Sequence, residues 1–87
     1  MDRFLTERET EALLREETRY IEMPDGERRA LRLFTLVWNS FDMILRTGTF
    51  NSSAIFTLAS QHSQRTGEAF EISFERVVGT IHRKLCD

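Results

Sequence analysis

The chain has 87 residues, of which 40% are hydrophobic and 30% charged, and a formal net charge of −2. This length predicts one domain over residues 1–87, at a size where a single core is only marginally stable. The slight acidity excludes a general electrostatic attraction to nucleic acid or to an anionic membrane. The single cysteine, Cys86, excludes an internal disulfide, and no segment resembles a signal peptide or a membrane span. We therefore expect a cytoplasmic protein.

A helix start signal stands near the N-terminus. Thr6 followed by Glu9 forms a T-x-x-E capping box, in which each side chain can bond the other residue's backbone N–H. This pattern predicts a helix from near Glu7 to about residue 23, ended by the Pro-Asp-Gly sequence at residues 24–26. The same sequence suits the turn of a short hairpin within residues 20–30. The hairpin is the second interpretation, because the arm after the turn, ERRA, lacks alternating apolar residues.

Residues 30–45, ALRLFTLVWNSFDMIL, form the most apolar segment. At about 100° per residue, most of their apolar side chains gather on one broad helical face, and Leu36 and Met43 fall on the opposite side. Apolarity on two sides is typical of a central helix with several neighbours. We therefore predict an all-α fold, a small bundle of about four helices around a central hydrophobic helix over residues 28–46, with Gly48 as its C-cap.

Two further helices are predicted after a short connection. Asn51 and the two serines after it are candidate N-caps for a helix that ends at Gly67. The last helix is predicted to be capped by Ser73 and to run to about Leu85, and Gly79 within it would allow a neighbour to approach closely. These two helices complete the predicted bundle.

Few residues have the spacing of a metal or catalytic site. His82 and Cys86 are four residues apart and would share a helix face, but a second pair of ligands is missing. Asp42 lies within the apolar central segment, where it is either solvated or paired with Arg46 one turn later. We expect no catalytic residues, no metal and no cofactor, and hence a protein that is not an enzyme.

The order of the predicted elements suggests one alternative function. The central helix, a turn over residues 47–50 and the third helix make a helix-turn-helix-like succession, which would make the chain a small DNA-binding transcriptional regulator. The acidic charge disfavours this alternative, as does the position of the base-reading side chains at the C-terminal end of their helix. The candidate nucleic-acid contacts are Gln61, His62, Gln64 and Arg65.

The aromatic content favours a protein partner instead. Seven phenylalanines, one tryptophan and one tyrosine are many large rings for this length. Trp38 and Phe41 are expected in the core, and the other rings either fill it too or anchor an interface. We predict a non-catalytic bacterial regulator of adaptor or anti-activator type that forms a homodimer. It is expected to bind another protein, such as a transcriptional regulator, and not a membrane. The candidate interface residues are Leu36, Met43, Phe50 and Phe56.

Overall fold

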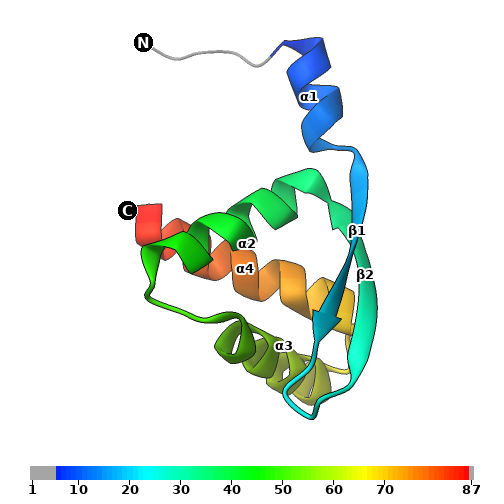
Figure 1. Ribbon diagram of the computed structural model, residues 1–87, viewed down its shortest axis with the longest axis vertical. Coiled ribbons are helices and arrows are strands. Elements are labelled where there is room, and N and C mark those ends of the chain that lie inside the picture. The colour runs from blue at the N-terminus through cyan, green and yellow to red at the C-terminus, as the bar shows by residue number, and fades with distance from the viewer. Residues whose placement is uncertain (1–5, 87) are drawn as a thin grey trace.

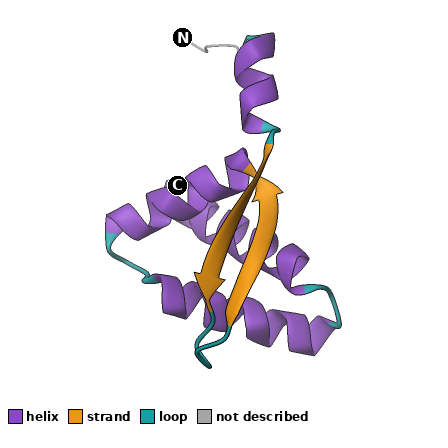
Figure 2. Cartoon of the chain, turned by 45° about the vertical axis from the view of Figure 1, so that its right-hand side comes forward, coloured by secondary structure: helices purple, strands orange, loops and turns teal. Residues whose placement is uncertain are grey.

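The computed structural model describes residues 6–86, in which four helices accompany one two-stranded antiparallel sheet. The two strands form a hairpin that lies across one side of three helices, and the first helix stands away from them at the open end of the hairpin (Figure 1, Figure 2). The predicted all-α fold is therefore wrong, because the protein is mixed α and β. In chain order the elements are α1 (Glu7–Leu13), β1 (Glu16–Glu22), β2 (Arg28–Phe34), α2 (Thr35–Thr47), α3 (Ser52–Thr66) and α4 (Phe70–Cys86).

The hairpin forms around the Pro-Asp-Gly sequence, as the second interpretation of these residues expected, and it is longer than residues 20–30. Its register pairs residue 16 with 34 and residue 22 with 28. In the turn, the Met23 N–H donates to the Glu27 carbonyl at 2.7 Å and the Gly26 N–H donates to the Met23 carbonyl at 2.8 Å. Gly26 adopts a φ of 88°, a conformation that a side chain would strain. The first predicted helix therefore ends at Leu13 instead of residue 23.

The predicted central helix over residues 28–46 merges a strand with a helix. Leu31 and Leu33 of β2 are buried, whereas the residues on either side of each are exposed, as expected of a strand with one face on the core. The helix begins only at Thr35, and its N-cap residue, Phe34, makes no side-chain cap hydrogen bond. A short run of apolar residues can fit both the period of two of a strand and the period of 3.6 of a helix. On a helical projection, apolar residues of β2 therefore fall on the same face as those of α2.

The predicted helix ends are confirmed at the positions that have a capping side chain or a C-cap glycine. The Thr6 hydroxyl accepts from the Glu9 N–H at 3.1 Å, and the Asn51 side chain accepts from the N–H three residues later at 2.7 Å. Gly48 and Gly67 are left-handed C-caps, with φ values of 75° and 77°. Side-chain caps and glycine caps depend on interactions between residues only a few positions apart, so they can be predicted from the sequence before the fold is known.

The last helix differs from its prediction at two positions. α4 begins at Phe70, one turn before the predicted cap, and Ser73 is completely buried. A Cβ added at Gly79 would have none of the described atoms outside its immediate helical surroundings within 4 Å. The predicted close approach of a neighbour at this glycine therefore does not occur within the described part of the chain.

The core lies between the inner face of the hairpin and the three helices α2, α3 and α4. Trp38 and Phe41 are buried, as predicted, with 0% and 6% of their surface exposed. Neighbouring rings in this core have centroids 5.3–6.2 Å apart, the spacing of favourable aromatic pairs. Most of the large rings therefore fill the core. The clustered rings are Trp38, Phe41, Phe56, Phe70 and Phe74.

Candidate functional site

Three exposed apolar side chains lie where α1, the hairpin and α2 meet. The backbone N–H and the hydroxyl of Thr35 both donate to the carbonyl of Arg15, at 2.8 and 2.9 Å, which continues the register of the hairpin by one pair. Leu14 precedes Arg15, and Phe34 and Leu36 flank Thr35, so all three are held close to this pair. Their exposed fractions are 52%, 41% and 48%. We call Leu14, Phe34 and Leu36 the junction surface.

The helix beside the junction surface has little packing of its own. None of the residues of α1 is buried, and the helix stands away from the rest of the fold (Figure 1). The Thr6 cap and the glutamates of the first turn favour its start electrostatically. A helix of seven residues is nevertheless well below the roughly 12–15 residues at which isolated helices become even marginally stable in water. Further packing against α1 would therefore stabilise it.

The predicted interface residues occupy different environments. Leu36 is exposed and belongs to the junction surface, and Met43 is partly exposed two turns later on α2. Phe50 is partly buried and packs against the core. Phe56 is only 4% exposed and stacks on Phe41 at a centroid distance of 5.7 Å, so it is not available to a partner in this fold.

Sequence reasoning missed two members of the junction surface. Leu14 falls within the predicted first helix and Phe34 within the predicted central helix, so neither is predicted as an interface residue. The structure ends the first helix before Leu14 and places Phe34 on the outer face of β2. Their exposure depends on the register of the hairpin, so only a correct assignment of the strands would have revealed it.

Asp42 is paired, but its partner is Arg19 and not Arg46, the partner that one of the two sequence interpretations expected. Two nitrogens of the Arg19 guanidinium donate to the two oxygens of Asp42 at 2.7 and 2.9 Å. These hydrogen bonds lower the pKa of Asp42 against the opposing effect of burial, and Arg46 contributes only a lesser Coulombic attraction. The same pair raises the pKa of Arg19. Asp42 therefore joins α2 to the hairpin as a structural residue.

The four predicted nucleic-acid contacts lie on the C-terminal half of α3 in two groups, because Gln61 and Gln64 line one hollow and His62 and Arg65 line another. Gln61, Gln64 and Arg65 are exposed. His62 is partly buried and turned toward α4, where its Nδ1 lies 3.0 Å from the Ser73 hydroxyl oxygen. Arg65 is the only arginine of α3, and α3 has no lysine, so the helix offers little positive charge for phosphate contacts.

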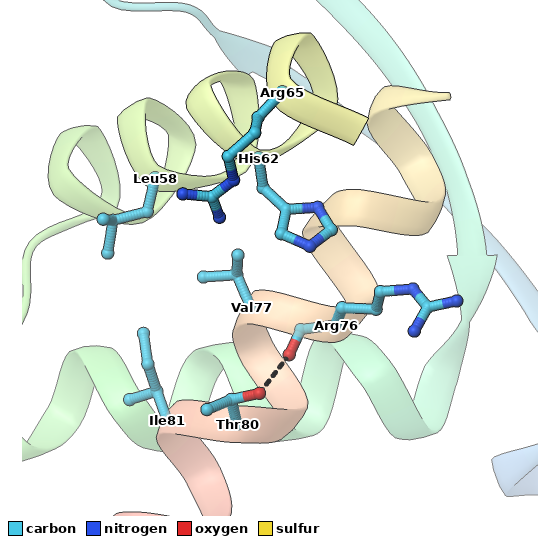
Figure 3. Close-up of a pocket in the computed structure, with 7 residues that line it drawn as sticks. All are labelled: Leu58, His62, Arg65, Arg76, Val77, Thr80 and Ile81. Atoms are coloured by element: carbon cyan, nitrogen blue, oxygen red, sulfur yellow. Dashed lines mark hydrogen bonds between the residues drawn. The ribbon is translucent and has the colours of Figure 1, made fainter. Parts of the chain in front are cut away.

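A pocket of about 280 Å³ opens between α3 and α4. Figure 3 shows that the apolar side chains from the two helices point toward one another across it, with charged groups around them. The pocket is on the helical side of the molecule, formed by elements that contribute no residue to the junction surface. Its lining residues are Leu58, His62, Arg65, Arg76, Val77, Thr80 and Ile81.

The predicted pairing of His82 and Cys86 on one helix face is seen, at 3.6 Å between Nε2 and the sulfur atom. Both are near the end of α4, and the Cys86 side chain is exposed. Within residues 6–86, no group of three or more histidine, cysteine, aspartate or glutamate side chains is placed to hold a metal ion.

Comparison with protein-family models, with curated proteins and with solved structures finds no match for this chain. Of the helices in residues 6–86, none combines the length and apolar character needed to cross a bilayer.

Proposed function

We propose that this protein is a non-catalytic protein-binding module that associates with a second copy of itself through the junction surface. The observation that supports this proposal is the exposure of Leu14, Phe34 and Leu36 around the hydrogen-bonded Arg15 and Thr35. Covering apolar surface is favourable by about 25 cal/mol per Å², and these side chains are held in place by backbone hydrogen bonds. A partner that covers them gains free energy without having to order a flexible loop.

A second copy of the chain suits this surface because of its neighbour α1. In a two-fold dimer the same patch on each subunit meets its counterpart, which would place α1 of each subunit beside α2 of the other. Such packing would cover the junction surface and stabilise a helix that has no buried residue here. Met43 lies further along α2 and would extend the contact. An 87-residue domain also gains from burying more surface between subunits.

We also infer a regulatory role for this dimer, which would act by occupying a surface of another protein, as an adaptor or anti-activator does. An apolar contact of this kind is not weakened by added sodium chloride as an ion pair is, because burial of apolar surface is not screened by ions.

Analytical ultracentrifugation of Leu36→Glu at micromolar concentration tests the proposal. We expect the wild-type protein to sediment as a dimer and Leu36→Glu as a monomer of 10.2 kDa with unchanged helical circular dichroism. The matched control is Ile72→Glu on α4, which is 44% exposed and outside the junction surface, and which should remain a dimer. A monomeric wild-type protein would contradict the proposal. Sequence-selective DNA binding that is lost in Arg65→Ala would support the DNA-binding alternative instead.

A further inference from the structure

The pocket between α3 and α4 has an apolar interior. Leu58 comes from α3, and Val77 and Ile81 come from successive turns of α4. Leu58 is 41% exposed and Ile81 is 8% exposed, so the pocket runs from the surface down to the edge of the core. Figure 3 shows the three side chains directed toward the same space. This part of the pocket suits a hydrocarbon group.

One cation of the pocket is without a partner. Arg65 stands seven residues after Leu58 on the same side of α3, and its guanidinium extends over the apolar side chains (Figure 3). Among residues 6–86 it makes neither a hydrogen bond nor an ion pair. Arg76 differs, because its Nε lies 3.0 Å from a Glu68 carboxylate oxygen and its guanidinium points away from the apolar side chains. Arg65 is therefore the group free to bind an anion from solution.

His62 adds a second polar group beside the apolar interior. Its Nδ1 is engaged with the Ser73 hydroxyl at 3.0 Å, which holds the ring between the two helices. The other ring nitrogen, Nε2, has no partner in the described part of the chain. A ligand that reaches both Arg65 and His62 would place its polar end at the α3 side of the pocket.

We propose that this pocket binds a small monocarboxylate with a short hydrocarbon body. A guanidinium presents two parallel donors that match the two oxygens of a carboxylate, and one unpaired arginine balances one negative charge. The volume of about 280 Å³ is just below the range of roughly 300–1,000 Å³ that is usual for small-molecule pockets, which suits a chain of several carbons better than a large ligand. The proposal does not depend on the junction surface or on dimer formation.

The test is an NMR titration of the full chain, labelled with ¹⁵N, with sodium butanoate, hexanoate and octanoate. We expect saturable shifts at the pocket residues and a Kd that falls about fourfold for each added methylene that enters the pocket, the factor that corresponds to burying one such group. Hexanamide has the same body without the charge and should bind about two- to fivefold more weakly, because Arg65 is exposed and an ion pair with an exposed side chain is partly screened by water.

Arg65→Gln should raise the Kd for hexanoate by about the same factor. The matched control is Arg46→Gln, another exposed arginine in the last turn of its helix, which should bind hexanoate as the wild type does. Equal affinity for hexanamide and hexanoate in the wild-type protein would overturn the proposal. Unsaturable shifts, shifts outside the pocket, or tighter binding of a peptide C-terminus than of every free carboxylate would overturn it too.

Discussion

Arg19 of β1 and Asp42 of α2 are joined by two parallel hydrogen bonds, although 23 residues separate them in the chain. The Arg19 guanidinium also lies 4.9 Å from the centre of the Trp38 ring. The Trp38 Nε1–H donates to the Glu17 carbonyl at 2.9 Å. These contacts hold β1 against Trp38, the largest fully buried side chain, and so connect the hairpin to α2.

Asp42→Asn is expected to lower the free energy of unfolding by about 1 kcal/mol at pH 7. The pair is bidentate, but the two side chains are 35% and 40% exposed, so water screens much of their attraction. Urea unfolding followed by circular dichroism measures the change. The double-mutant cycle with Arg19→Gln is the control, because Asp42→Asn should cost little once Arg19 has gone. Equal costs in both backgrounds would show that the pair contributes nothing.

The same pair makes stability depend on pH in acid. Arg19 holds the pKa of Asp42 below its ordinary value of 3.8, so folding favours the ionised form. The contribution is therefore complete above about pH 5 and is lost as the pH falls through the folded-state pKa. The stability difference between wild type and Asp42→Asn should be constant from pH 5 to 7 and shrink below about pH 4. A difference that grew on acidification would contradict this sign.

Trp38→Ala is expected to cost about 3–5 kcal/mol and to unfold most of the protein at room temperature. The ring is completely buried and touches the rings of both Phe41 and Phe74. Tyr20→Ala is the control, because that ring is 73% exposed on the outer face of the hairpin and its loss should change stability by less than about 0.5 kcal/mol. Thermal unfolding followed by far-ultraviolet circular dichroism distinguishes them, and similar effects of both changes would contradict the assigned core.

Gly79→Ala is expected to stabilise the protein by about 0.5–1 kcal/mol. Gly79 is inside α4 without a positive φ, and an added Cβ has open space around it. Gly48→Ala is the control with the opposite expected sign. Gly48 has a φ of 75°, which strains any side chain, so this substitution should destabilise the protein by about 1 kcal/mol. The two melting temperatures should move in opposite directions. A lower melting temperature for Gly79→Ala would mean that another molecule packs closely on this glycine.

The sequence determined the features whose chemistry is local. The capping box at Thr6, the Asn51 cap and the glycine caps at residues 48 and 67 set helix ends through contacts within a few residues. The core positions of Trp38 and Phe41 were also predictable, because the two residues are three positions apart within α2 and therefore lie on the same face of that helix.

The choice between strand and helix for residues 16–34 depends on contacts between distant parts of the chain. In RRALRLF, Leu31 and Leu33 alternate as in a strand, and Leu31 and Phe34 also fall on the apolar face of a helix continued into α2, so the choice depends on whether β1 is available as a partner. The same pairing leaves Leu14, Phe34 and Leu36 at the surface and brings Arg19 to Asp42. Packing of α3 against α4 likewise brings Arg65 over Val77 in the pocket. Contacts between residues far apart in the chain leave no periodic signal, and this is why the fold class and the candidate sites required the structure.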